Sequence, residues 1–156
     1  NGICYAGGLE AALTCDFIYA DEVARFAQTE CKIGIMPGNM GTQNLPRAVG
    51  ERRAKELILS AQPFTAAEAH AWGMVNKVCA PGTVVAEALT TAEMIADCAP
   101  LSVRQAKKAI HIGLQTDLHS AFRYELEAYY PLLNTEDRKE GIAAFNEKRK
   151  AHFQGR

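Results

Sequence analysis

The sequence predicts an α/β fold with a mixed core over residues 1–80 and a helical region over residues 81–156. Three observations carry this prediction. Short apolar runs broken by glycines fill the first 40 residues, apolar residues follow helical spacing over most of the remainder, and no internal repeat or low-complexity linker interrupts the 156 residues. The chain is 48% hydrophobic and 22% charged, which is typical of a globular protein and excludes a disordered one.

In the first half, apolar runs alternate with turn residues. We expect strands at residues 3–6, 17–20 and 25–28, because each is a short apolar run bounded by polar or glycine residues. A short helix at residues 9–15 is predicted from the helical spacing of Leu9, Ala12 and Leu13. The turn residues between 36 and 41 predict a loop.

The second half is predicted to be mostly helical. Thr65 and Glu68 have the spacing of a capping box, and Gly73 suits the left-handed position after a helix. Trp72 is expected in the core, as are Met36 and Met94. The apolar character of the last helices indicates a surface for a partner. The predicted helices cover residues 51–60, 83–98, 102–115, 118–133 and 136–149, with a strand at 74–78.

Charge and cysteine usage narrow the function classes. With 17 basic and 18 acidic residues, the chain lacks the basic excess of a nucleic-acid binder, and no apolar run approaches the ~20 residues of a membrane span. The five cysteines form no CxxC pair, so we expect buried thiols in a reducing compartment, the cytoplasm or the mitochondrial matrix. The four histidines lack ligand spacing, so no metal site is expected. The start at Asn1, directly before a predicted strand, suggests that an N-terminal portion is absent.

Two acidic positions are candidates for chemistry. Gly7 and Gly8 lie between a predicted strand and helix, where backbone amides at a helix start can bind a developing oxyanion, and Glu10 follows in the first turn. Glu30 follows the third strand and precedes the glycine-rich loop, so it can share one water with a second carboxylate. Each feature taken alone is also compatible with an ordinary turn or a solvated glutamate.

Several ordered motifs resemble the enoyl-CoA hydratase/isomerase (crotonase) family over nearly the whole chain. The stretch NGICYAGGLEAALTCD (1–16) is similar to the family's core signature, and FAQTECKIGIMPGNMGTQNLPRAVG (26–50) to its second. Later matching segments are AKELILSA, AAEAHAWGMVNKV and TEDRKEGIAAFNEKR. The resemblance corresponds to the C-terminal three-fifths of a family member. It implies a crotonase-like ββα superhelix core with a C-terminal helical oligomerisation region.

The resemblance also implies roles for single residues. Gly7 matches an oxyanion-hole glycine whose backbone amide binds the thioester carbonyl, and Glu10 and Glu30 match the two catalytic glutamates that hold water. Gly38 matches a glycine whose amide touches that water. Phe145 and Lys148 match helix residues at the coenzyme A pocket of a neighbouring active site. The second oxyanion donor of the family belongs to a part that precedes Asn1.

The implied reaction is the addition of water to a trans-2-enoyl-CoA, giving a 3-hydroxyacyl-CoA in fatty-acid β-oxidation. No cofactor is expected apart from the coenzyme A of the substrate, and the implied assembly is a homotrimer or a dimer of trimers. Two alternatives stay open: other acyl-CoA chemistry of the family, as isomerase, lyase or hydrolase, and a non-catalytic subunit of the same fold. The sequence departs from the family at Asn39, Met40 and Asn44, and Met40 is expected to reshape the acyl pocket.

Overall fold

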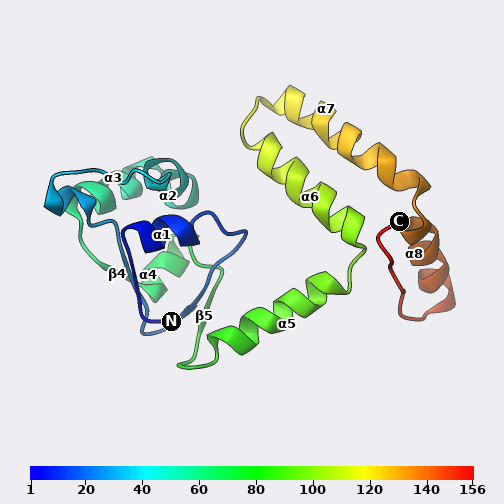
Figure 1. Cartoon of the computed structure of the whole chain (residues 1–156), viewed down its shortest axis with the longest axis horizontal. Helices are drawn as coiled ribbons and strands as arrows, with labels where there is room; N and C mark the ends of the chain where they lie inside the picture. Colours follow the sequence, from blue (N-terminus) through cyan, green and yellow to red (C-terminus); the bar gives the residue numbers. More distant parts are fainter. The chain divides into compact units, whose positions relative to one another are not determined.

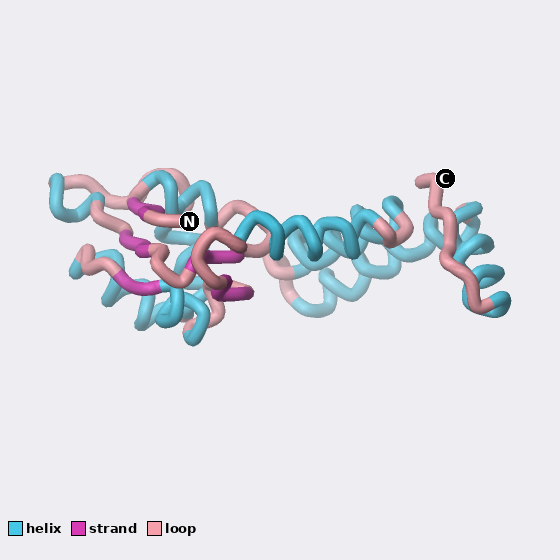
Figure 2. Tube along the Cα trace, turned by 90° about the horizontal axis from the view of Figure 1, so that it is seen from below, coloured by secondary structure: helices cyan, strands magenta, loops and turns pink.

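The computed structural model describes all 156 residues, which form two compact units (Figure 1). The first unit covers Asn1–Leu89 and the second Thr90–Arg156, so the division falls inside helix α5 (Val84–Ala96). All strands belong to the first unit, whereas the second consists of helices and their connections (Figure 2). No helix is long and apolar enough to cross a membrane.

Two small sheets organise the first unit. Strands β1 (Ile3–Tyr5) and β3 (Arg25–Ala27) pair in parallel, and β4 (Phe64–Thr65) adds antiparallel to β3. Strands β2 (Tyr19–Asp21) and β5 (Lys77–Cys79) form a second, parallel pair. All four predicted strands are present. The last begins three residues later than expected because the backbone amides of Met74 and Val75 bond to the carbonyl of Ala69 at a helix end.

The helices of the first unit include one that the periodicity did not single out. Helix α3 (Glu51–Ser60) has the predicted bounds, and the predicted capping box starts helix α4, because Thr65 accepts from the Glu68 amide while Glu68 accepts from Thr65. Gly73 adopts a φ of 87°, as predicted. Helix α2 (Gly41–Val49) was not expected. The remaining helices of this unit are α1 (Gly7–Ala12), α4 (Ala66–Ala71) and the 3₁₀ helix η1 (Glu30–Ile33).

The core of the first unit lies between its sheets and helices. Phe64 stacks on Phe26 of the neighbouring strand, and its ring centre lies 5.4 Å from that of Trp72. Trp72 packs half-buried against this core, which confirms its prediction, whereas Met36 is exposed and its core prediction was wrong. Met36 lies in the connection before Pro37, outside any element that packs on the core. The fully or largely buried side chains include Leu9, Phe26, Leu45, Leu57, Phe64, Met74 and Val75.

The second unit is a helical array. Helices α6 (Pro100–Gly113) and α7 (Leu118–Tyr129) lie side by side as an antiparallel hairpin (Figure 1), and Asp117 caps α7 through the amide of Ser120. The predicted helix at 118–133 ends in the 3₁₀ helix η2 (Tyr130–Asn134), which contains Pro131. Helix α8 (Glu136–Glu147) follows, with Thr135 as its N-cap. Met94, expected in the core, is exposed on α5.

The five cysteines are free thiols, but the expectation of burial holds for only part of them. Cys79 is buried and Cys4 half-buried, where burial raises the pKa of the Cys4 thiol. Cys15, Cys31 and Cys98 are exposed, so burial was wrongly predicted for them. Cys15 and Cys98 lie just after the ends of α1 and α5, and Cys31 lies in η1.

Candidate active site

Glu10 is a buried carboxylate fixed by backbone amides. Helix α1 carries it in its first turn, and the residue is only 4% exposed. Its Oε1 accepts hydrogen bonds from the amides of Asn39 at 2.8 Å and Gly41 at 2.9 Å. Since Gly41 is the first residue of α2, the carboxylate lies at the positive ends of two helices, where negative charge is stabilised. Its Oε2 accepts no hydrogen bond from the chain and keeps contact with solvent.

Gly41 permits this arrangement because it has no side chain. A Cβ at this position would lie 2.8 Å from Oε1 of Glu10, 2.8 Å from the amide group of Gln28 and 2.9 Å from Cβ of Pro37. Gln28 and Pro37 are fully buried. The Glu10 carboxylate and the Gln28 amide therefore lie against the same backbone position.

Gln28 connects this region to Glu30 through hydrogen bonds. Glu30 is 7% exposed and begins η1, three residues after the end of β3. The Gln28 amide nitrogen, in the orientation that satisfies its neighbours, donates to both carboxylate oxygens of Glu30 at 3.0 Å. The two predicted glutamates are thus joined through Gln28 and Gly41, neither of which was singled out from the sequence.

The two predicted glycines present free backbone amides. The amides of Leu9 and Glu10 bond to the carbonyl of Ala6, whereas the Gly7 amide has no partner within the chain. Ala6 itself has a φ of 50°, a region that residues with a side chain rarely adopt and that often marks functional turns. The Gly38 amide, in the loop that holds Glu10, is also without a partner in the chain, and both glycines are exposed.

The two predicted coenzyme A residues belong to the second unit. Phe145 lies in the last turn of α8 and is 84% exposed, which is unusual for a phenylalanine. Lys148 is the C-cap of the same helix, and its amide donates to the carbonyl of Phe145 at 3.3 Å. The structure thus groups Gly7, Glu10, Glu30 and Gly38 in one unit and this pair in the other.

The first group has the chemistry of an acid–base site. Two buried carboxylates can exchange protons with a bound water, and the free amides of Gly7 and Gly38 can donate to a substrate oxygen and to that water. Such a site suits the addition or removal of a proton or water next to a polarised carbonyl. Two buried glutamates beside free backbone amides are thus the arrangement that acid–base enzymes use, and this defines the class of site.

Comparison with known proteins identifies the family. Residues 1–156 match enoyl-CoA hydratase/isomerase along their whole length, and the chain belongs to this family. It is 42% identical to the mitochondrial enoyl-CoA hydratase of Pongo abelii, covering 98% of this chain and 53% of that protein. It is 44% identical to the crotonyl-CoA hydratase of Syntrophomonas wolfei, covering 98% and 59%.

Solved structures agree on the fold. The enoyl-CoA hydratase of Bacillus anthracis is similar at a TM-score of 0.98 and 44% identity, over 100% of this chain and 60% of that one. The predicted crotonase-like fold is thereby confirmed. The chain also matches a probable enoyl-CoA hydratase of Rhizobium meliloti. It spans between 53% and 61% of the length of this protein and of the Pongo abelii and Syntrophomonas wolfei relatives.

Proposed function

We propose that the protein is an enoyl-CoA hydratase, which adds water across the double bond of a trans-2-enoyl-CoA. The observation that carries this proposal is the Glu10 carboxylate, which two amides hold through Oε1 while Oε2 meets solvent. Gln28, which lies against Gly41 as Glu10 does, donates to a second buried carboxylate on Glu30. Relatives named enoyl-CoA or crotonyl-CoA hydratase, at 42–44% identity, support the same reaction.

In the proposed mechanism the two glutamates divide the work. Glu10, fixed through Oε1, orients a water with Oε2 and helps to remove its proton as the oxygen attacks C3 of the enoyl group. Electrons of the double bond move toward the thioester, whose oxygen is stabilised by the Gly7 amide. Glu30, which enters the cycle protonated, then delivers its proton to C2, while the Gly38 amide donates to the attacking water. The proton that Glu10 took from the water passes to Glu30 before the next turnover, so the substrate gains one OH at C3 and one H at C2, the atoms of one water.

We further propose that Phe145 and Lys148 take part in binding coenzyme A. The Lys148 ammonium is a compact positive charge of the kind that binds phosphates, and the exposed Phe145 ring precedes it by three residues. No metal or other cofactor is required for this chemistry, because the carboxylates and amides supply the acid, the base and the oxyanion donor.

Hydration of crotonyl-CoA, followed by loss of the conjugated thioester absorbance, tests the proposal. Glu10→Gln and Glu30→Gln should each lower kcat by about 10²–10⁴-fold, the usual contribution of a general acid or base. Glu22→Gln is the matched control, because Glu22 is an exposed glutamate of the same unit. Turnover that survives both active-site substitutions would refute the proposal. Without turnover of the unmutated protein, retained binding of coenzyme A thioesters would indicate another acyl-CoA reaction, and lost binding a non-catalytic subunit.

We also propose that the protein is a homo-oligomer, a trimer or a dimer of trimers, joined through the second unit. A largely apolar pocket of about 720 Å³ opens between α6 and α7, and the large side chains around it are exposed. Large apolar side chains that lie exposed together on one pair of helices are typical of a surface that a partner covers. The pocket includes Ile110, Leu114, Leu118 and Phe122. Phe122→Asp should lower the mass seen by analytical ultracentrifugation; an unchanged mass, or a monomeric parent, would contradict this assignment.

A further inference from the structure

Three consecutive basic residues follow helix α8, and only one of them has a free charge. The Arg149 guanidinium binds Glu140 through both terminal nitrogens, at 2.6 and 2.8 Å, and Nζ of Lys150 lies 2.8 Å from Oδ2 of Asp97. The Lys148 ammonium makes no ion pair or hydrogen bond with the chain. Lys148 is therefore the basic residue of this run that is available to an anion.

The backbone of Lys148 is held in an unusual conformation. Its φ of 55° and ψ of 38° place it in the left-handed region, which residues with a side chain rarely adopt. The amide of the next residue, Arg149, donates to the carbonyl of Ala144 at 3.0 Å, which closes the end of the helix. The backbone conformation of Lys148 thus depends on the contacts that hold the next residue, Arg149.

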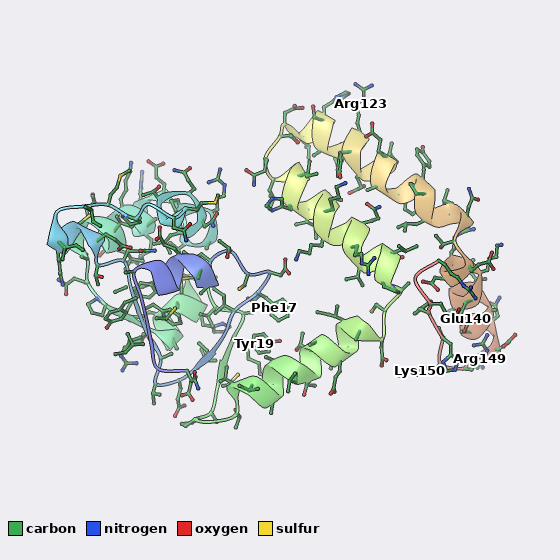
Figure 3. The ribbon with its side chains drawn as sticks, viewed as in Figure 1. Phe17, Tyr19, Arg123, Glu140, Arg149 and Lys150 are labelled. Atoms are coloured by element: carbon green, nitrogen blue, oxygen red, sulfur yellow. The ribbon has the colours of Figure 1, made fainter.

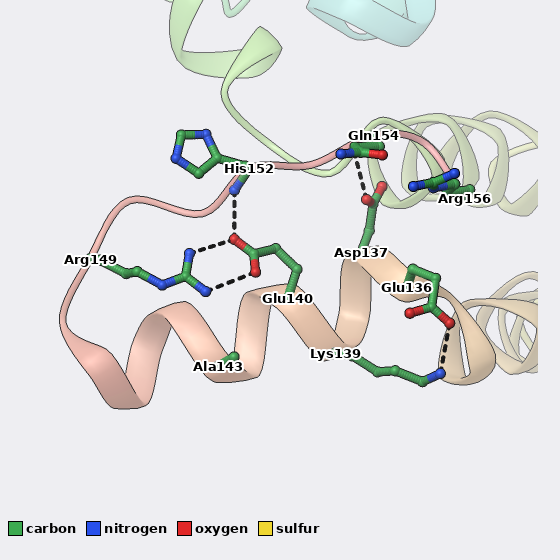
Figure 4. A pocket seen from close by; sticks show the side chains of 9 residues that line it. All are labelled: Glu136, Asp137, Lys139, Glu140, Ala143, Arg149, His152, Gln154 and Arg156. Carbon is green, nitrogen blue, oxygen red and sulfur yellow. Dashed lines mark hydrogen bonds and ion pairs between the residues drawn. The ribbon is translucent and has the colours of Figure 1, made fainter.

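Glu140 supplies that hold. Besides its two contacts with Arg149, its Oε1 accepts from the amide of His152 at 2.8 Å, so one carboxylate on α8 fixes two points of the segment that follows (Figure 4). These bonds lower the pKa of Glu140 to about 2, so the Glu140 carboxylate stays charged at neutral pH. Figure 3 shows Glu140 and Arg149 beside each other at the end of the chain.

We propose that Glu140 and Arg149 are positioning residues that hold Lys148 ready to bind the phosphates of coenzyme A. The proposal rests on the function proposed above. The two residues do not touch the ligand; they tie the segment after the strained residue Lys148 back to α8, so that the backbone of Lys148 need not be ordered when the ligand arrives. Arginine suits this task, because its planar fork matches a carboxylate with two parallel bonds that lysine cannot make.

Affinity for acetyl-CoA, measured by isothermal titration calorimetry on the intact protein, tests the proposal. Glu140→Gln and Arg149→Lys should each raise Kd by about three- to tenfold, the effect of leaving the segment around Lys148 to be ordered on binding. The matched control is Glu136→Gln, which removes the same charge from the same helix but breaks only the exposed pair with Lys139. This control should change Kd less than about twofold.

Two further measurements separate positioning from general damage to the fold. In a Lys148→Ala background, Glu140→Gln should weaken binding no further, because the group that it positions is gone. With crotonyl-pantetheine, which carries the thioester without the nucleotide phosphates, turnover should be the same in parent and Glu140→Gln. With crotonyl-CoA, KM should rise while kcat stays unchanged.

Each result decides. Equal Kd values in parent, Glu140→Gln and Arg149→Lys overturn the proposal, as do additive losses with Lys148→Ala or a parent that does not bind acetyl-CoA. If the parent binds acetyl-CoA and the variants weaken as expected but crotonyl-CoA is not hydrated, the positioning role stands and the hydratase assignment fails. If hydration is present and the variants bind like the parent, the reverse holds.

Discussion

A side chain at Gly41 should disturb the fold and the candidate site together. In Gly41→Ala the new Cβ would lie 2.8 Å from the Glu10 carboxylate, 2.8 Å from the Gln28 amide and 2.9 Å from Pro37. Real Cβ atoms do not approach other atoms this closely, and all three neighbours are buried. Something in the loop or in α1 must therefore move.

The size of the effect follows from the two ways in which the overlap can be relieved. If the surroundings stay in place, overpacking of a buried site lowers the free energy of unfolding by about 1–3 kcal/mol. If Glu10 moves instead, it loses charge-assisted bonds to the amides of Asn39 and Gly41, worth roughly 1.5–3 kcal/mol each. The first route predicts a loss of about 2 kcal/mol, and the second, in which both bonds break, predicts roughly 3–6 kcal/mol. A displacement of the Glu10 carboxylate by ~1 Å should also lower kcat by about 10²-fold.

Urea unfolding followed by tryptophan fluorescence measures the first effect. Trp72 is the single tryptophan of the chain and packs against the core of the first unit, so it reports on this unit. Gly8→Ala is the control, because a Cβ at this position meets nothing within 4 Å. Since alanine is the better residue inside a helix, this substitution should raise the free energy of unfolding by about 0.5–1 kcal/mol. A Gly41→Ala protein as stable as the Gly8→Ala protein would refute the packing argument.

Three further predictions concern other parts of the chain. Thr65→Ala removes the acceptor of the Glu68 amide at the start of α4 and should lower the free energy of unfolding by about 1 kcal/mol in the same urea experiment. Met40→Gly should raise it by roughly 0.5–1 kcal/mol, because Met40 has a φ of 71°. The folded-state pKa of Glu140 is about 2 and its ordinary value is 4.5. Its contribution to stability is therefore complete above pH 4.5 and is lost as the pH falls toward 2, so thermal unfolding of parent and Glu140→Gln should converge over that range.

Local signals in the sequence were sufficient where an element carries its own boundaries. Helix α3 begins after Gly50 and ends at Ser60 as predicted, and Thr65 caps α4 through residues that are its near neighbours in the chain. Before β5, the local bonds of Met74 and Val75 to Ala69 are followed by a long-range pairing of Asn76. Asn76 donates its amide to the carbonyl of Ile18 and accepts the Ile18 amide on Oδ1, a pairing between distant segments that no local pattern indicates.

Helix α2 shows why some elements could not be predicted. Its N-cap is Met40 in a left-handed conformation, without a side-chain cap, and Pro46 lies in its interior, where proline normally breaks a helix. The helix is instead stabilised by tertiary contacts. Leu45 is fully buried against the core, and the Glu10 carboxylate binds the amide of Gly41 at the start of the helix.

In the candidate site, too, some residues could be selected from the sequence, whereas others depend on tertiary contacts. Glu10 and Glu30 could be selected from the sequence because the family resemblance matched both, whereas each taken alone was also compatible with an ordinary turn or a solvated glutamate. The residues that join them could not. Gln28 differs from a surface glutamine only by its burial, and the importance of Gly41 depends on which side chains come to lie against it.

The same bonds therefore serve both the helix and the site, which determines how Glu10 should be tested. The Glu10 carboxylate caps α2, so Glu10→Ala would leave the amides of Asn39 and Gly41 without their acceptor and lower stability as well as activity. Glutamine keeps a carbonyl oxygen that can accept both amides while it removes the charge and the proton exchange. A Glu10→Gln protein that unfolds within about 1 kcal/mol of the parent but has lost turnover would assign the loss to chemistry. Equal losses of stability in Glu10→Gln and Glu10→Ala would show that the charge itself, and not the accepting oxygen, holds the start of α2.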